Sequence, residues 1–190
     1  MTIPDKISLF RMALAPVLLL LAWFRAGQYF IIVLALAYIS DAVDGPIARR
    51  YGQESELGPR LDTWADVSIY LSVPLAAWWL WPELFKREIL YFTLIIASIL
   101  FPLLAGLAKF RQTTSYHTWL TETAAVCTTL STLLLFTGFT PWPFRVSSGL
   151  CVLAGIEEMF VTLVLGRPAS NVRSLWHAVR DKAGQPDISA

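Results

Sequence analysis

The amino-acid sequence predicts an all-α integral membrane protein, a bundle of six transmembrane helices followed by a short polar tail. Of its 190 residues, 56% are hydrophobic and only 15% are charged. The apolar residues fall into segments close to the length of about 20 residues that a helix needs to cross a bilayer. Turn-forming pairs such as Ala26-Gly27 and Pro82-Glu83 separate these segments. The net charge of +1 gives no electrostatic reason to expect a nucleic-acid partner.

The predicted helices differ in how continuously apolar they are. For the first, Lys6 and Arg11 precede an apolar run from Met12 to Phe24, as in a signal peptide, but no small-x-small cleavage site comes after it, so we expect a retained span. The second and third are apolar for only part of their length, because four aspartates occupy the rest. The last three are mostly apolar, and no role is assigned to Glu157 and Glu158 in the sixth. The six predicted spans are Ile7–Phe24, Tyr29–Arg50, Pro59–Leu80, Ile89–Ala108, Trp119–Phe139 and Phe144–Leu165.

The distribution of charge predicts that both termini face the cytoplasm. With six spans, most of the lysines and arginines lie on the side that holds the N-terminus, and this side of a membrane protein is normally cytoplasmic. The other side holds only Arg25, Lys86, Arg87 and Arg145. An aromatic belt at the predicted outer ends of the spans agrees with this orientation: Trp23, Trp78, Trp79, Trp81 and Trp142. We therefore expect a membrane domain over residues 1–166 in a bacterial inner membrane, with a cytoplasmic or interfacial tail over residues 167–190.

The aspartates lie at helical spacing within residues 41–66, in the second and third predicted helices. A carboxylate in a membrane segment is costly and usually functional. Residues three and four apart share one face of a helix. One stripe holds Asp41, Asp44, Gly45 and Ala48, and the other holds Gly58, Asp62 and Asp66. If the two helices pack antiparallel, the stripes face each other and four carboxylates converge near the cytoplasmic interface.

Four carboxylates in one place call for divalent cations, most plausibly a pair of Mg²⁺ ions, with Mn²⁺ as the second choice. Such a site suits phosphoryl transfer, because two ions can hold the attacking and leaving oxygens on either side of a phosphorus. The small residues Gly45, Ala48 and Gly58 make room for a diphosphate. The planar guanidinium of Arg49 suits a phosphate oxygen. A purely structural alternative, in which the aspartates pair with nearby arginines, explains one or two of the acids but not four at this spacing.

The pattern Asp-x2-Asp-Gly-x2-Ala-Arg-x8-Gly-x3-Asp-x3-Asp is met at every position from Asp41 to Asp66. It resembles the signature of the CDP-alcohol phosphotransferases. The resemblance implies transfer from a CDP-linked donor to an alcohol with release of CMP, by a homodimer. It also implies that Asp41, Asp44 and Asp62 hold two metal ions, with Asp66 both a ligand and the general base. The donor would then be surrounded by Asp44, Gly45, Ala48, Arg49 and Gly58.

The substrates follow less directly from the residues. A lipid donor, CDP-diacylglycerol, fits a site at the membrane boundary, although a soluble CDP-alcohol with a lipid acceptor is the mirrored alternative. The opening Ile3-Pro4 to Arg11 is similar to phosphatidylglycerophosphate synthases and to the related cardiolipin synthases, which implies glycerol 3-phosphate as the acceptor. Its phosphate would be bound by Lys109, Arg111 and His117, with Arg11 a weaker candidate. Ordinary positive-inside charge explains each of these cations equally well.

Three positions depart from the pattern of the phosphatidylglycerophosphate synthases: Thr63, Val67 and Glu122. Other acceptors therefore stay open, namely phosphatidylglycerol, inositol, inositol phosphate and serine. Two further functions also stay open: a non-catalytic membrane protein that binds divalent cations or CDP-lipids, and a hydrolase that uses water in place of the alcohol. A transporter would place acids deep within the spans, whereas the aspartates here lie at one end.

Overall fold

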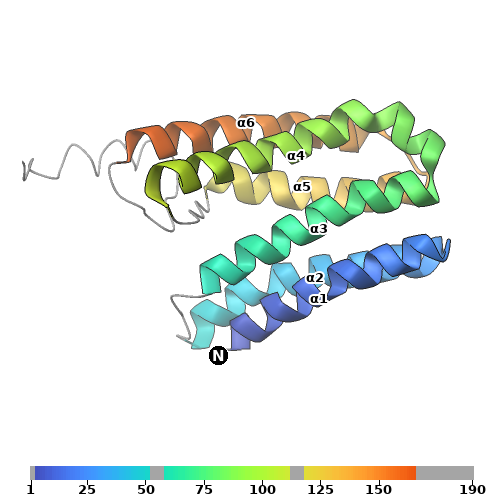
Figure 1. Cartoon of the computed structure of the whole chain (residues 1–190), viewed down its shortest axis with the longest axis horizontal. Coiled ribbons are helices and arrows are strands. Elements are labelled where there is room, and N and C mark those ends of the chain that lie inside the picture. Colours follow the sequence, from blue (N-terminus) through green and yellow to red (C-terminus); the bar gives the residue numbers. More distant parts are fainter. Residues whose placement is uncertain (1–2, 52–57, 112–117, 166–190) are drawn as a thin grey trace, which may run out of the picture. The chain divides into compact units, whose positions relative to one another are not determined.

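The computed structural model describes residues 3–51, 58–111 and 118–165 (Figure 1). Within these ranges the chain forms six α-helices and no strand, as the sequence predicts. The helices are α1 (Ile3–Trp23), α2 (Gly27–Tyr51), α3 (Gly58–Leu80), α4 (Pro82–Phe110), α5 (Trp119–Phe136) and α6 (Trp142–Val164).

Two helix ends differ from their predicted positions for identifiable reasons. Helix α4 begins at Pro82 rather than at Ile89, because a proline at the first position and Glu83 in the first turn both favour a helix start. Helix α5 ends at Phe136 rather than at Phe139, because Gly138 adopts the left-handed conformation with φ of 77°. The N–H groups of Gly138 and Phe139 donate to the carbonyls of Leu135 and Leu134 at 3.1 and 3.2 Å, which is the Schellman arrangement.

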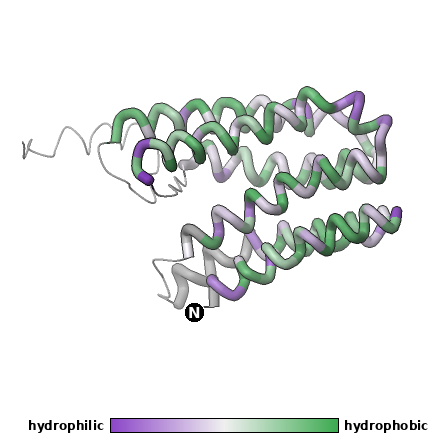
Figure 2. The backbone as a smooth tube through the Cα atoms, viewed as in Figure 1, coloured by the Kyte–Doolittle hydropathy of each residue, from purple (hydrophilic) through white to green (hydrophobic). Residues whose placement is uncertain are grey.

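The apolar character of the helices divides them into two kinds. Four helices are long and apolar enough to cross a membrane: α1 over Asp5–Trp23, α4, α5 and α6. Among the described side chains, α2 contributes a shorter apolar stretch, Gly27–Asp41. Figure 2 shows hydrophobic residues along most of α4 and α6. The six crossings and the inward orientation of both termini stay predictions. Helices α2 and α3 carry the aspartates, and over the described residues neither is among the helices that are long and apolar enough to span a membrane.

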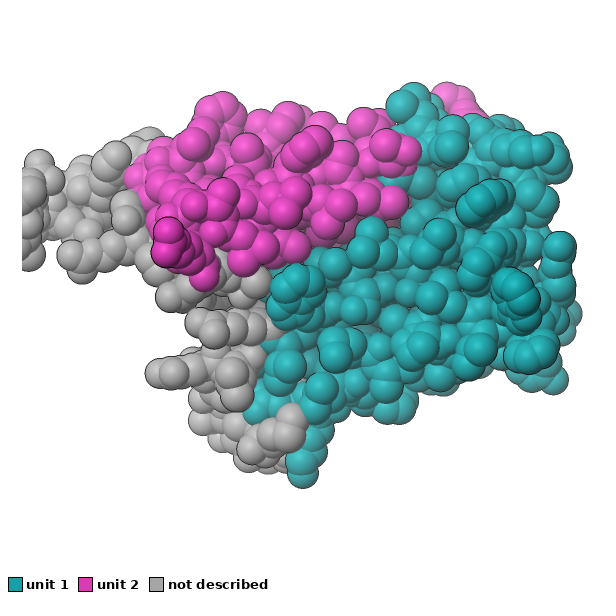
Figure 3. All heavy atoms as spheres, viewed as in Figure 1, with its two compact units in different colours: residues 1–92, 132–139 teal, residues 93–131, 140–190 magenta. Residues whose placement is uncertain are grey.

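The helices belong to two compact units (Figure 3). The first comprises residues 1–92 and 132–139 and contains α1, α2 and α3, with α1 packed against both of the others. Small side chains let these helices approach closely, since Ala65, Ala76 and Ala77 of α3 are fully buried. At one end of the unit the ring of Trp81 stacks on Phe136 at 4.9 Å between centroids. The packing of α1 against α2 and α3 positions the polar ends of those two helices.

The second unit comprises residues 93–131 and 140–190 and contains most of α4 and α5 and all of α6. Helices α4 and α6 approach so closely at Gly155 that an added Cβ atom would lie 2.6 Å from the carbonyl oxygen of Ser98. Hydroxyl groups join α5 to α6, as in the 2.8 Å contact between Ser131 and Ser147. Such small and polar residues are the usual means of helix association in a membrane.

Glu157 and Glu158 have partners within the second unit. Thr118, just before α5, donates to Oε2 of Glu157 at 2.9 Å and accepts from the backbone N–H of Thr121 at 3.1 Å, which caps the helix. The hydroxyl of Thr121 donates to Oε1 of Glu158 at 3.0 Å. The two glutamates therefore fasten the start of α5 to α6.

We expect Gly138→Ala to destabilise the protein by about 1 kcal/mol, because an alanine in the left-handed region is strained. The reason is purely conformational, since a Cβ atom at Gly138 would meet no atom within 4 Å. Gly149→Ala is the matched control: its Cβ atom would also enter open space, but within α6 alanine is favoured by up to about 1 kcal/mol. Unfolding in detergent micelles measures both, and equal effects of the two substitutions would contradict the argument.

Candidate metal centre and active site

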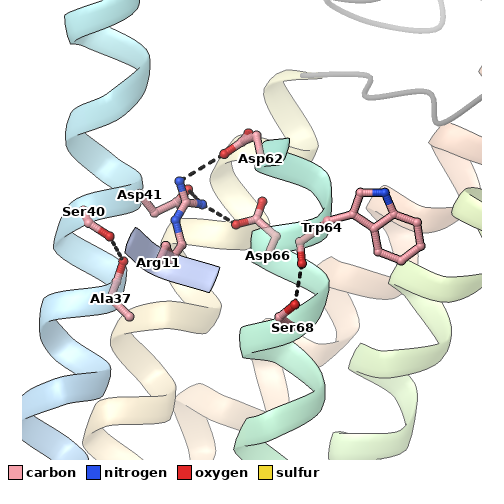
Figure 4. A network of polar contacts seen from close by, with 8 residues as sticks. All are labelled: Arg11, Ala37, Ser40, Asp41, Asp62, Trp64, Asp66 and Ser68. Carbon is pink, nitrogen blue, oxygen red and sulfur yellow. Dashed lines mark hydrogen bonds and ion pairs between the residues drawn. The ribbon is translucent and has the colours of Figure 1, made fainter. Parts of the chain in front are cut away.

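Two helices of the first unit bring three of the predicted aspartates together (Figure 4). Asp41 lies on α2, and Asp62 and Asp66 lie one turn apart near the start of α3. The spacing of four residues puts the α3 pair on one face. Oxygen atoms of the three carboxylates lie within 4.8 Å of one another. The sequence predicts that four carboxylates converge; three of them do so here, and the side chain of the fourth, Asp44, lies outside the described residues.

The three carboxylates remain accessible. The side chains of Asp41, Asp62 and Asp66 are 42%, 21% and 37% exposed. In Figure 4 they point toward a common point, whereas the indole of Trp64 extends away from the cluster. Hard carboxylate oxygens in this number are ligands for Mg²⁺ or Mn²⁺, so the donor set fits the divalent cations that the motif implies.

A fourth residue, Arg11 of α1, completes the cluster. Its guanidinium is buried, with 1% of the residue exposed. Nη1 donates to Oδ1 of Asp41 and to Oδ1 of Asp66, and Nη2 donates to Oδ1 of Asp62 at 3.0 Å. Arg11 therefore binds all three described carboxylates and links α1 to α2 and α3.

Sequence reasoning assigned Arg11 only a minor role, as a weak candidate for an acceptor phosphate. The signal that could have found it is its position inside a predicted span, where a charged residue usually has a partner. The positive-inside rule accounts for a cation at that end of any span, so it explains Arg11 without a partner among the aspartates.

Several predicted residues lie where the structure is silent. Helix α2 is continuous to Tyr51, as the predicted stripe requires, but the side chains of Asp44, Ala48 and Arg49, and the surroundings of Gly45, lie outside the described residues. His117 also lies outside them. Gly58 begins α3, one turn before Asp62. The roles of these residues stay predictions.

Two of the cations proposed for an acceptor phosphate, Lys109 and Arg111, lie in the second unit. The ammonium of Lys109 donates to the backbone carbonyls of Thr162, Leu163 and Leu165 at 2.8, 3.0 and 2.9 Å. These carbonyls end α6, where a helix leaves its last acceptors without partners and favours a positive charge. Arg111 is exposed and has a φ of 55° just after α4 ends. Phosphate binding by either residue stays a prediction, and Lys109 has a second, structural role.

Comparison with known proteins identifies the family. The family described as "CDP-alcohol phosphatidyltransferase" matches this chain over residues 1–164. The chain belongs to this family. The match includes both the aspartate motif and Arg11, and it confirms the resemblance seen in the sequence.

Curated relatives share about half of the chain. A protein of Streptomyces coelicolor named "Cardiolipin synthase (CMP-forming)" is 38% identical over 106 residues, covering 52% of this chain and 46% of the relative. Proteins of Mycobacterium bovis and Mycobacterium tuberculosis, each named "Putative cardiolipin synthase", are 31% identical to this chain over 98 residues. Each match covers 47% of this chain and 47% of the relative. The chain thus spans about half the length of the curated relatives it matches.

Lys109→Met separates the two roles of this residue. If the ammonium mainly completes the end of α6, its loss should lower the thermal unfolding temperature and reduce transfer to every acceptor by a similar factor. If it binds an acceptor phosphate, the KM for a phosphorylated acceptor alone should rise. The hydrogen bonds favour the first result. An unchanged unfolding temperature with a raised KM for glycerol 3-phosphate only would contradict it.

Proposed function

We propose that the chain transfers a phosphatidyl group from CDP-diacylglycerol to an alcohol and releases CMP, at the cytoplasmic face of a bacterial inner membrane. The observation that carries this proposal is the convergence of Asp41, Asp62 and Asp66 in a chain that belongs to the CDP-alcohol phosphatidyltransferases. Two divalent cations, Mg²⁺ before Mn²⁺, are the proposed cofactors. When bound at the aspartates they would neutralise the diphosphate of the donor and the charge that develops during transfer.

The protein residues would then do three things. Asp44, Gly45, Ala48, Arg49 and Gly58 bind and orient the CDP group. Asp66 accepts the proton of the acceptor hydroxyl, and the hydroxyl oxygen attacks the phosphorus that carries the diacylglycerol. The bond from that phosphorus to the CMP oxygen breaks, and CMP leaves in line with the attack. Among the described residues, Arg11 binds Oδ1 of Asp66, which leaves Oδ2 as the proton acceptor.

A lipid donor agrees with the position of the cluster. In the sequence, the charged residues of α2 begin at Asp41, after an apolar stretch, so acyl chains can lie along the apolar helices while the head group reaches the aspartates. Large apolar side chains are exposed on these helices, among them Leu20, Leu36 and Phe101. Such exposure suits contact with lipid rather than water. A donor that is a soluble CDP-alcohol has no acyl chains to bind to this apolar surface.

Two acceptors are supported by different observations. The opening of the chain resembles phosphatidylglycerophosphate synthases and the related cardiolipin synthases, and the first of these resemblances favours glycerol 3-phosphate. The relatives are named cardiolipin synthases, one of them CMP-forming, which favours phosphatidylglycerol as a lipid acceptor. The departures at Thr63, Val67 and Glu122, and the engagement of Lys109 with α6, support phosphatidylglycerol over the phosphorylated acceptor. Assembly as a homodimer, with the catalytic domain in residues 1–166, belongs to the same proposal.

An acceptor panel tests this function. Purified full-length protein with Mn²⁺ and CDP-diacylglycerol is offered phosphatidylglycerol, glycerol 3-phosphate, inositol, inositol phosphate or serine, and CMP release is measured. We expect release to depend on one alcohol and to stop with excess EDTA. Release without any alcohol would indicate hydrolysis instead, and no release with any acceptor would count against catalysis by this chain.

Asp66→Asn should lower the transfer rate by at least 10²-fold, because a general base typically contributes 10²–10⁴-fold. Binding of CDP-diacylglycerol should weaken much less, since the other donor-binding residues remain. Glu83→Gln, at an exposed acid on α4, is the control and should leave the rate unchanged. Transfer by the Asp66→Asn protein at the wild-type rate would exclude Asp66 as the base.

A further inference from the structure

Arg11 is the one charged residue of the cluster to which the transfer chemistry assigns no step. It comes from α1, a helix that is otherwise apolar enough to cross a membrane. Burying a guanidinium is costly unless its charge is compensated. Its presence beside the aspartates therefore calls for a function at this site.

The guanidinium binds the same groups that a metal ion would use. Nη1 lies between Oδ1 of Asp41 and Oδ1 of Asp66, and Nη2 binds Oδ1 of Asp62. These are the three carboxylates whose oxygens lie close enough together to share one cation. A divalent ion that took an oxygen from each would meet the guanidinium, and like charges at such separations repel strongly in a poorly screened site.

We propose that Arg11 is the resident counter-ion of the carboxylate cluster, and that a divalent cation binds by displacing its guanidinium from at least one of Asp41, Asp62 and Asp66. The guanidinium keeps three mutually repelling carboxylates assembled and lowers their affinity for a metal ion. This inference rests on the metal site of the proposed function. It adds a residue of α1 to a site otherwise built from α2 and α3.

A different role for Arg11 predicts the opposite sign. If the guanidinium held Oδ1 of each aspartate only to aim the remaining oxygens at a metal ion, it would be a positioning residue. Its removal would then weaken metal binding. The repulsion between a guanidinium and a divalent ion decides for displacement, because both cations would occupy the centre of one small cluster.

The test measures Mn²⁺ binding to purified full-length protein in dodecyl maltoside, from the electron paramagnetic resonance signal of unbound Mn²⁺. Arg11→Met should bind Mn²⁺ at least tenfold more tightly than the wild type. Arg11→Gln, which also lacks the charge but keeps polar contacts, should change in the same direction and serves if the methionine variant does not fold. Arg11→Lys retains the charge and should stay within threefold of the wild type. Size-exclusion chromatography checks that each variant is folded.

Two controls define what the signal reports. Lys6→Met removes an exposed charge from the same helix, and its affinity for Mn²⁺ should stay within twofold of the wild type. Asp62→Asn removes a proposed ligand and should weaken binding at least tenfold. Together they separate an effect of the cluster from a general change in charge.

The outcomes distinguish this inference from the proposed function. Equal or weaker Mn²⁺ binding by a folded Arg11→Met or Arg11→Gln protein, with normal binding by the wild type, would overturn displacement and leave the metal site intact. No Mn²⁺ binding by the wild type would overturn the metal site itself, and the role of Arg11 with it.

Discussion

Repulsion among the carboxylates of Asp41, Asp62 and Asp66 is the constraint on which the rest of the site depends. With oxygens within 4.8 Å of one another, each pair of anions repels by roughly 3 kcal/mol at an effective dielectric constant of about 20. Cations must therefore accompany the cluster. Arg11 supplies one positive charge from α1, and the excess negative charge suits a divalent ion. The packing of α1 against both α2 and α3 brings that guanidinium to the cluster.

The same constraint explains why α2 and α3 are the least apolar helices. A carboxylate cannot lie deep in hydrocarbon without a large penalty, so the helices that carry the aspartates must place them where the apolar segment ends. In α2 the charged residues begin at Asp41 and follow a stretch without charge. The other helices carry no part of this cluster apart from Arg11, and they keep the apolar length that a membrane span requires.

The sequence predicted those parts of the fold and site that depend on local spacing. Six helices and the meeting of Asp62 with Asp66 follow from hydrophobic length and from four-residue spacing. The start of α4 and the end of α5 also have local signals, in Pro82 and Gly138 respectively. Hydrophobicity alone places these two boundaries several residues away. The contacts of Arg11 and Lys109 depend on which helix faces pack together. A lysine whose acceptors lie more than 50 residues further along the chain cannot be told in the sequence from one that binds a phosphate.

This difference also explains why the reaction is easier to read than the acceptor. In the proposed reaction the aspartates act on the diphosphate and on the attacked phosphorus, which every CDP-linked donor shares, so their spacing indicates the chemistry and is visible locally. Recognition of an acceptor depends on cations that have competing uses in a membrane protein. They set the orientation, complete helix ends such as that of α6, and neutralise acids as Arg11 does. A count of lysines and arginines near the site is therefore a poor guide to a phosphorylated acceptor, and the partners of each cation have to be known first.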